Sequence, residues 1–364
     1  METKKVIIFI AKLEMGGAER VASTLANYWA EQSWDVMLLT QAPSESDFYE
    51  LQPTIERRTL NLLEESGSLS AALKQNYYRI RSLRKIFKAY QPHAVISLLP
   101  QSNTLAILSA TGLSCKIIVS ERSNPLKDPL SILWKVARRA FYRFADHVVL
   151  QSSGVLEWAT DFVPHSKIKV IPNPLISHFN LNASHEFVMP SGHIIIAMGR
   201  LSVEKNYDQL ISAFSLIAKE IPTSKLVILG EGDQRPLLEK LIHKLDLHQQ
   251  VYLPGKIAQP HALVAKAQII ALSSEYEGFP NALLEGMALG LAAISYDCPY
   301  GPADLIDNGT SGFLVPVGNT HEMAKAMSLL LTSPALIKSM SKEARKVNER
   351  YATKKIMRQW EALI

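Results

Sequence analysis

The sequence contains only two cysteines in 364 residues, Cys115 and Cys298, and neither lies in a metal-type spacing. A disulfide framework needs more cysteines, so we expect a reducing compartment, the cytoplasm. No cluster of histidine and cysteine indicates structural zinc, and we expect neither a metal nor a cofactor. Long apolar runs are also missing. Residues 6–11 are too few for a signal peptide or a membrane span, and they suit a buried parallel strand.

Apolar residues are plentiful and charge is unevenly distributed. Hydrophobic residues make up 47% of the chain, which allows sizeable cores, and the length suits two α/β domains. Residues 1–175 hold 21 Lys and Arg against 16 Asp and Glu, whereas the remainder holds 18 of each. Between Lys74 and Arg143, 13 basic residues are opposed by only Glu121 and Asp128. Such a run is commonly a solvated face, but this bias indicates an anionic partner.

Short apolar runs alternate with amphipathic stretches, and this alternation indicates parallel sheets. The predicted strands lie near residues 5–11, 35–40, 94–98, 116–120, 147–150, 193–198, 225–229, 250–253, 268–272, 292–295 and 313–315. The predicted helices lie near residues 17–31, 70–90, 101–111, 130–144, 206–219, 234–245, 260–265, 280–289, 302–307, 320–331, 334–348 and 352–363. A short strand in residues 168–174 ends at prolines that flank Asn173, so we place a domain boundary there.

The expected fold is therefore α/β, with two doubly wound domains that face each other across a cleft. Ligands of such sheets bind outside the carboxyl ends of the strands, so we look for functional residues directly after predicted strands.

The strongest motif is Glu277-Gly-Phe-Pro-Asn-Ala-Leu-Leu-Glu285, which follows a buried strand. Pro280 suits the first turn of a helix, and the backbone N–H groups of Asn281 and Ala282 would then be open to a phosphate. Glu285 lies about 7 Å further along the helix at ~1.5 Å per residue, so two carboxylates would flank a diphosphate. Carboxylates bind sugar hydroxyls well, and one Glu would serve a sugar and the other a ribose. A capping Glu plus an exposed helix Glu is the alternative.

A second motif, Gly199-Arg200-Leu-Ser-Val-Glu-Lys205-Asn206, follows the first strand of the second domain. Arg200, through its guanidinium fork, and Lys205, as a point charge, would both face a diphosphate. They would neutralise a leaving nucleotide diphosphate as a sugar bond breaks. Two surface cations near a helix start are the alternative, although a cation is unfavourable there unless an anion lies beside it.

Glycines follow three further strands. Gly230 and Gly232 close one strand, and the segment Val251–Ile257 contains another strand end. Together they would form a wall on which a nucleobase stacks, with plain tight turns as the alternative. Gly16-Gly17 opens a helix after the first strand and would let that loop reach the donor across the cleft. The third glycine of a dinucleotide fingerprint is missing here.

These motifs recur in the order found in a known family. The chain resembles, over nearly its whole length, the retaining GT-B glycosyltransferases of family 4, through the motifs Gly16-Gly17-Ala18-Glu19-Arg20, Gly199-Arg200…Lys205-Asn206, Leu229-Gly230-Glu231-Gly232 and Glu277…Glu285. It is similar in particular to bacterial enzymes that extend polyprenyl-diphosphate-linked glycans, including the PglH-like N-acetylgalactosaminyltransferases. The resemblance implies a GT-B fold with two Rossmann-like domains. Residues 1–173 would form the acceptor side, residues 174–349 would bind the nucleotide sugar, and a helix at 350–364 would cross back to the first domain.

The resemblance also implies roles. The donor would be a UDP-linked sugar, and no metal would be essential. Arg200 and Lys205 would hold the diphosphate, Glu277 the donor-sugar hydroxyls and Glu285 the ribose. The implied donor-binding set is completed by Gly16, Gly17, Gly230, Ile257, Gly278, Phe279, Pro280, Asn281 and Ala282. Retention in this family is ascribed to front-side attack, in which the leaving phosphate assists deprotonation of the acceptor.

One position departs from the family pattern. Many relatives carry a histidine in the loop at residues 120–125, where this chain has Arg122 in Ser-Glu-Arg-Ser-Asn-Pro. An arginine cannot act as a general base at neutral pH. We therefore name no protein base and expect Arg122 to bind donor or acceptor phosphate. An Asn-Pro turn without chemistry is the alternative for this loop.

Two basic stretches interleaved with aromatic residues, 74–88 and 134–144, suit an anionic membrane surface. A polyprenyl-diphosphate-linked acceptor would be found there, so we expect a peripheral location on the inner face of the cytoplasmic membrane. The alternative, that the apolar residues face the domain core, applies to part of each helix. We expect no nucleic-acid partner.

Two other functions stay open from the sequence. One is a non-catalytic nucleotide-sugar-binding protein, and the other is a GT-B epimerase that acts on a UDP-sugar without an acceptor. Donor choice among UDP-Gal, UDP-GalNAc, UDP-GlcNAc, UDP-Glc and GDP-Man would depend on the shape near Glu277 and the loop at residues 298–303.

Overall fold

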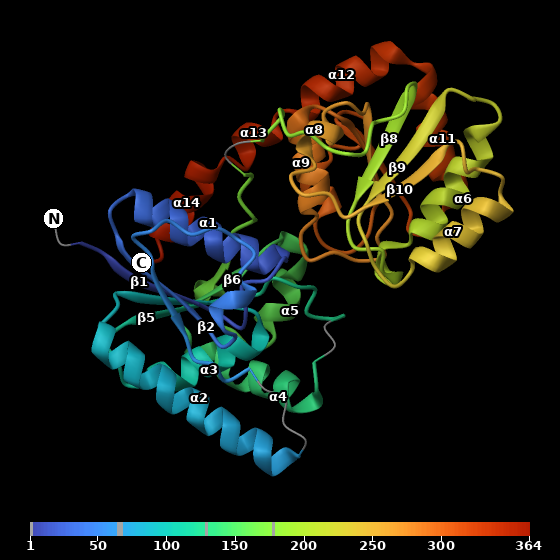
Figure 1. Cartoon of the computed structure of the whole chain (residues 1–364). Coiled ribbons are helices and arrows are strands. Elements are labelled where there is room, and N and C mark those ends of the chain that lie inside the picture. The colour runs from blue at the N-terminus through green and yellow to red at the C-terminus, as the bar shows by residue number, and fades with distance from the viewer. Residues whose placement is uncertain (1–2, 64–67, 128–129, 177–178) are drawn as a thin grey trace. The chain divides into compact units, whose positions relative to one another are not determined.

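The computed structural model describes residues 3–63, 68–127, 130–176 and 179–364. Its contacts divide the chain into two compact units (Figure 1). Unit 1 comprises Met1–Pro174 together with Lys354–Ile364, and unit 2 comprises Leu175–Thr353. The acceptor-side and donor-side roles of these parts, and the cleft between them, stay predictions.

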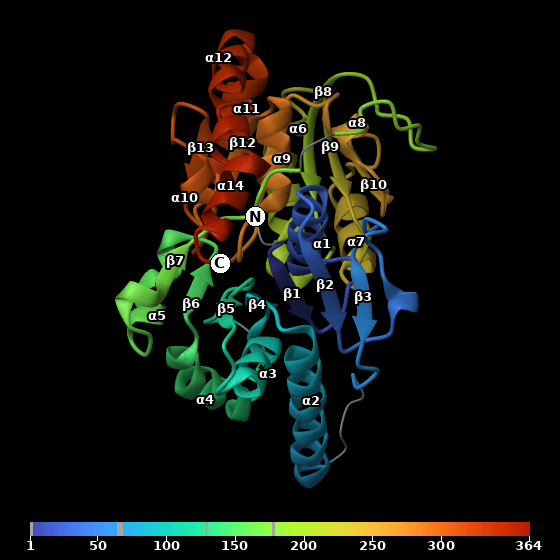
Figure 2. The same cartoon turned by 90° about the vertical axis from the view of Figure 1, so that its left-hand side faces the viewer.

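Unit 1 is built on a seven-stranded parallel sheet in the order β3-β2-β1-β4-β5-β6-β7, which Figure 2 shows side by side. The strands are β1 (Lys5–Ile10), β2 (Asp35–Thr40), β3 (Glu56–Thr59), β4 (Ala94–Leu98), β5 (Lys116–Ser120), β6 (His147–Leu150) and β7 (Ile168–Val170). The central strands are runs of Val, Ile, Leu and Phe because helices cover both faces of the sheet. The edge strand β3 reads Glu-Arg-Arg-Thr and was missed by the apolar pattern.

Helices lie on both faces of this sheet (Figure 1). They are α1 (Gly17–Glu31), α2 (Leu69–Tyr90), α3 (Pro100–Ala110), α4 (Ile132–Phe141), α5 (Leu156–Thr160) and α14 (Thr353–Glu361), with short 3-10 turns at Ser44–Ser46, Tyr142–Phe144, Ser153–Val155 and His165–Lys167. The carboxyl-terminal α14 packs into unit 1, because Ile356, Met357 and Trp360 join the core formed by α1 and β1. No helix in the described ranges is both long enough and apolar enough to cross a membrane.

Unit 2 has a six-stranded parallel sheet in the order β10-β9-β8-β11-β12-β13. Its strands are β8 (His193–Met198), β9 (Ser224–Leu229), β10 (Val251–Gly255), β11 (Ile269–Leu272), β12 (Ala292–Tyr296) and β13 (Gly312–Val315). Its helices are α6 (Tyr207–Ala218), α7 (Arg235–Lys244), α8 (His261–Val264), α9 (Asn281–Leu289), α10 (Pro302–Leu305), α11 (Thr320–Thr332), α12 (Pro334–Ala344) and α13 (Val347–Arg350), with a 3-10 turn at Val203–Lys205.

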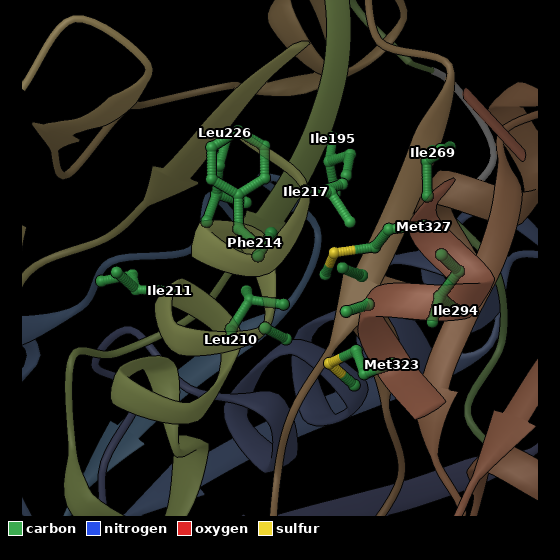
Figure 3. Close-up of a cluster of buried hydrophobic side chains, with 14 of the residues drawn as sticks. Ile195, Leu210, Ile211, Phe214, Ile217, Leu226, Ile269, Ile294, Met323 and Met327 are labelled. Carbon is green, nitrogen blue, oxygen red and sulfur yellow. The ribbon is translucent and has the colours of Figure 1, made fainter. Parts of the chain in front are cut away.

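Two cores hold the sheet of unit 2. On one face, α6 and α11 pack Phe214 and Met327 against Ile195 and Ile294 (Figure 3). On the other face, α9 buries a row of leucine and methionine side chains against the strands. The α/β fold with two Rossmann-like parallel-sheet domains is thereby confirmed.

The strand order of unit 2 determines where its loops meet. From β8 the chain moves outward to β9 and β10, and it then returns to β11 on the other side of β8. The direction in which successive strands are added to the sheet therefore reverses between β8 and β11. Because these two strands are parallel neighbours, the loops that follow them lie side by side. This switch point is where doubly wound sheets bind their ligands.

Candidate active site

Lys205 and Glu277, 72 positions apart in the sequence, meet at the switch point of unit 2. Lys205 ends the short turn after β8, and Glu277 lies in the loop after β11. The Lys205 Nζ is 2.7 Å from Oε1 of Glu277. The hydroxyl of Ser274 donates to the same Oε1 over 2.6 Å, and the hydroxyl of Ser273 donates to the backbone oxygen of Lys205 over 2.7 Å. Both loops are thus fastened to each other.

Both hydrogen bonds to the carboxylate of Glu277 go to the same one of its two oxygens. The residue is 9% exposed, and both of its donors bind Oε1. In the described part of the chain, Oε2 has no hydrogen-bond partner. A carboxylate fixed in this way has a defined orientation and one oxygen that can accept a ligand hydroxyl.

Neutral groups surround this ion pair. Burial raises the pKa of the Cys298 thiol to about 12, and the charge of Glu277 adds to the rise while Lys205 opposes it. Burial also raises the pKa of Tyr207, with Glu277 and Glu204 as further causes. Both groups stay protonated at neutral pH and add no charge to the site.

The glycines after β8 and β9 serve the contact between two loops. A Cβ on Gly230 would lie 1.8 Å from the backbone oxygen of Gly199, and Gly230 has a φ of +151°. The Gly199 N–H donates to Leu229 O over 3.0 Å, and the Gly230 N–H donates to Gly255 O over 2.9 Å. Only glycine fits position 230, because the neighbouring backbone fills the space of a side chain. Ile257, two residues beyond Gly255, is half-buried against the core of unit 2.

The start of α9 differs from the expectation. Pro280 is the residue before the helix rather than part of its first turn. The N–H of Asn281 donates to Phe279 O over 2.9 Å, so the prediction that this group is open was wrong. The tight turn that positions Pro280 places this donor and acceptor together. The Ala282 N–H has no backbone partner among the described residues, and the Phe279 side chain is buried in the core.

Glu285 has a partner that the sequence analysis missed. Its Oε2 lies 3.0 Å from Nε2 of His261, the first residue of α8, and the two side chains are 5% and 12% exposed. The ring of Phe179 lies 4.8 Å from the imidazole, between ring centroids. The one available signal was the position of His261 in the segment after β10, near a carboxyl strand end. Glu277 and Glu285 are therefore held by different partners, Lys205 and His261.

The other expected site residues differ in setting. Arg200 is exposed on the loop after β8, and Gly278 is half-buried beside Glu277. Gly16 and Gly17 belong to unit 1, where Gly16 precedes α1 and its oxygen accepts the hydroxyl of Tyr49 over 2.9 Å.

The carboxylate of Glu19 folds back over this glycine. A Cβ on Gly16 would lie 2.2 Å from Oε2 of Glu19, so a side chain at position 16 would displace that carboxylate. Burial raises the pKa of Glu19.

Arg122 also belongs to unit 1, directly after β5. Its guanidinium is buried, Nη1 donates to Oδ1 of Asn173 over 2.6 Å, and Cζ lies 5.2 Å from the ring centre of Trp360. Among all the described residues, no group of three or more His, Cys, Asp or Glu side chains is placed to hold a metal ion.

Two family models match consecutive parts of the chain. Residues 15–176 match Glycosyltransferase Family 4, and residues 186–347 match Glycosyl transferases group 1. The matched segments correspond to the two units and to both sets of motifs.

Individual relatives match at full length. A GalNAc-alpha-(1->4)-GalNAc-alpha-(1->3)-diNAcBac-PP-undecaprenol alpha-1,4-N-acetyl-D-galactosaminyltransferase from Campylobacter jejuni is 28% identical over 99% of this chain and 98% of its own length. An uncharacterized glycosyltransferase from Haemophilus influenzae is 26% identical over 99% of this chain and all of its own.

Solved structures share the fold. A glycosyltransferase from Rickettsia africae superposes with a TM-score of 0.82 at 17% identity, covering 100% of this chain and 98% of the other. The Anabaena protein HepE, solved in complex with UDP, reaches a TM-score of 0.79 at 16% identity, with 98% of both chains covered. The chain is a glycosyltransferase of the GT-B fold and belongs to the family that joins a Glycosyltransferase Family 4 domain to a Glycosyl transferases group 1 domain.

Proposed function

We propose that this glycosyltransferase moves a hexose or N-acetylhexosamine from a UDP-sugar to a polyprenyl-diphosphate-linked glycan, with retention of anomeric configuration. The observation that carries the donor side is the Lys205–Glu277 pair at the switch point of unit 2. The acceptor class is supported by the Campylobacter jejuni relative, whose name describes transfer to an undecaprenol-linked glycan. The UDP donor is supported by the HepE complex. Neither finding supports the epimerase or the non-catalytic alternative.

In the proposed reaction, the donor diphosphate lies against Arg200 and Lys205, and the donor sugar lies against Oε2 of Glu277. The bond from the sugar C1 to the diphosphate oxygen breaks while the acceptor hydroxyl forms a new bond to C1 on the same face. The hydroxyl proton passes to the departing diphosphate. Lys205 stabilises the charge that builds up on this leaving group, because a preorganised cation in a partly buried site needs little reorganisation.

Glu285 is proposed to accept the two ribose hydroxyls of the nucleotide. His261 bonds one of its oxygens and thereby fixes the plane of the carboxylate. A buried carboxylate needs such a partner, since an unpaired one is costly to desolvate. In this proposal His261 is a positioning residue for the nucleoside.

A thermal-shift screen of nucleotide sugars tests the donor proposal. At a ligand concentration of 100 times Kd, binding adds about 2.7 kcal/mol to the free energy of unfolding, so the correct donor raises Tm clearly. We expect the response from a UDP-sugar rather than from GDP-mannose, with UMP as the control that lacks the second phosphate. The absence of any response to UDP or its sugars would overturn the donor proposal.

We also propose that unit 1 associates peripherally with an anionic membrane through α4. Its outward face carries Ile132 and Val136, which are 81% and 59% exposed, and Arg139 further along the helix. The exposed Arg143 follows in the 3-10 turn Tyr142–Phe144. Arg139 forms an ion pair with Asp161, in which Nη2 lies 3.6 Å from Oδ2. Exposed apolar side chains beside cations fit the interface of an anionic bilayer.

The other basic stretch lies in α2, where some side chains serve the fold, although Tyr77 and Tyr78 are 55% and 50% exposed. In α2, the side chains of Leu83 and Phe87 are buried. Arg84 donates to the backbone oxygens of Ser109 and Thr111, so part of its donor capacity serves the fold. Glu121 is also buried and does not reduce the positive charge of the surface, and Asp128 lies outside the described residues.

Replacing both Ile132 and Val136 with glutamate is expected to weaken binding to vesicles that contain phosphatidylglycerol by at least about tenfold, since two buried apolar groups are lost and two charges repel the lipid. Co-sedimentation of the full chain measures this. Leu216→Glu on α6 of unit 2, where Leu216 is 46% exposed, is the matched control and should bind as the wild type does. Equal binding by the double variant would contradict the assignment of α4.

A further inference from the structure

The guanidinium of Arg122 is buried in unit 1 with most of its hydrogen-bonding capacity unused. The residue is 8% exposed, and Nη1 donates to Oδ1 of Asn173. Nε and Nη2 are buried and have no partner among the described residues. A guanidinium carries five N–H donors, so a single acceptor leaves this group largely unsatisfied.

A second buried arginine of unit 1 shows the usual arrangement. Arg138 is 3% exposed, and its Nη1 lies 3.7 Å from Oε2 of Glu121. Around Arg122, by contrast, burial lowers the pKa of the guanidinium to about 9, and no described carboxylate acts against this shift. Buried charges in proteins are paired or bind a charged ligand, so an unpaired guanidinium points to an anion.

The strand order brings further donors to the same place. Arg122 follows β5 and Asn173 follows β7, and β6 lies between these strands. The hydrogen bond that joins the two residues therefore spans the end of β6, where Gln151 and Ser152 leave the sheet. Nε2 of Gln151 and the hydroxyls of Ser152 and Ser123 are also buried without a partner in the described part of the chain. We call Arg122, Ser123, Gln151 and Ser152 the Arg122 cluster.

Trp360 of α14 packs against the guanidinium of Arg122. The indole is fully buried, and the guanidinium lies over its ring. The face of an indole attracts a cation and lowers the cost of burying it, but it does not replace the missing acceptors. The returning carboxyl-terminal helix thus stabilises the charge of Arg122 and leaves its N–H groups for another partner.

We propose that the Arg122 cluster is a diphosphate-binding site. Guanidinium, amide and hydroxyl donors follow the neighbouring strands β5 and β6 at their carboxyl ends, where ligands of such sheets bind. A ligand that satisfies them must be rich in acceptor oxygens and negatively charged, and the guanidinium fork matches two phosphate oxygens. The inference rests on the proposed function, since both the donor and the lipid-linked acceptor carry a diphosphate. Unit 1 is the proposed acceptor side, so we expect the acceptor's diphosphate.

The test measures binding of farnesyl diphosphate and of UDP to the full chain by titration, with farnesol as the uncharged control. In Arg122→Met, affinity for farnesyl diphosphate should fall at least about tenfold, and affinity for UDP should stay unchanged. Arg122→Lys keeps the charge but loses the fork, and it should bind more weakly than the wild type. Arg58→Met removes an exposed charge of the same unit, on the edge strand β3, and should have no effect.

Each outcome either supports or overturns the assignment of the Arg122 cluster to the acceptor's diphosphate. Loss of UDP binding with farnesyl diphosphate retained would keep the site but assign it to the donor. Wild-type affinity of Arg122→Met for both diphosphates would overturn the proposal, and Arg122 would then serve only to fix Asn173 and Trp360. The readout is binding rather than turnover, so a failure of the proposed transfer reaction would appear separately, as binding without product.

Discussion

Glu277→Gln is expected to lower kcat for sugar transfer by about 10²- to 10³-fold while the protein stays folded. Glutamine keeps the shape of the side chain, but it removes the charge that binds Lys205 over 2.7 Å and replaces one of the two acceptor oxygens with an NH₂ donor. The carboxamide has one oxygen, so it cannot bind Ser274 and accept a sugar hydroxyl at separate oxygens. Both the orientation of Lys205 and the contact to the sugar are then impaired.

The measurement is steady-state transfer from the donor identified by thermal shift, accompanied by circular dichroism of the variant. Glu275→Gln makes the same chemical change two residues earlier, at an exposed position of the same loop, and it should retain nearly full activity. If Glu277→Gln transferred sugar within about threefold of the wild-type rate, Glu277 would not be part of the catalytic machinery.

The sequence was sufficient to predict that Lys205 and Glu277 lie at the same edge of a sheet, because each follows a buried strand. Their pairing could not be read from the sequence, since it depends on β8 and β11 being neighbours at the switch point. The contact of His261 with Glu285 could not be predicted for the same reason. That contact depends on where α8 begins relative to α9, and no residue pattern in the chain encodes that distance.

The fold shows where local patterns are sufficient and where they fail. Central strands such as β1 and β8 were predictable because buried parallel strands are continuous apolar runs. The strand β3, Glu56–Thr59, was not, because this edge strand consists of polar and charged residues, of which Arg57 is paired with Asp47. The expected helix at residues 130–144 is divided into α4 and a 3-10 turn at Tyr142–Phe144. The Tyr142 hydroxyl donates to Glu121, so tertiary contacts hold this turn.

Trp360→Ala is expected to lower the free energy of unfolding of unit 1 by about 3–5 kcal/mol, since large-to-small changes of buried aromatic residues cost this much. Trp360 is fully buried in the core that also contains Trp29 and Ile8. The residue is four positions from the carboxyl terminus, yet it packs with the first strand of the chain. The loss should therefore appear in unit 1 and not in the unit 2 residues that directly precede α14 in sequence.

Hydrogen exchange followed by mass spectrometry locates this effect. In Trp360→Ala, amides of β1 and β4 should exchange faster, and those of β8 and β12 should keep the wild-type rate. Met340→Ala is the matched control for unit 2, because Met340 is 1% exposed in the core of that unit. It precedes residue 353, after which the chain belongs to unit 1 again. The substitution should loosen β8 and β12 and leave β1 unchanged. Faster exchange of β8 in Trp360→Ala, with β1 still protected, would show that α14 stabilises unit 2 instead.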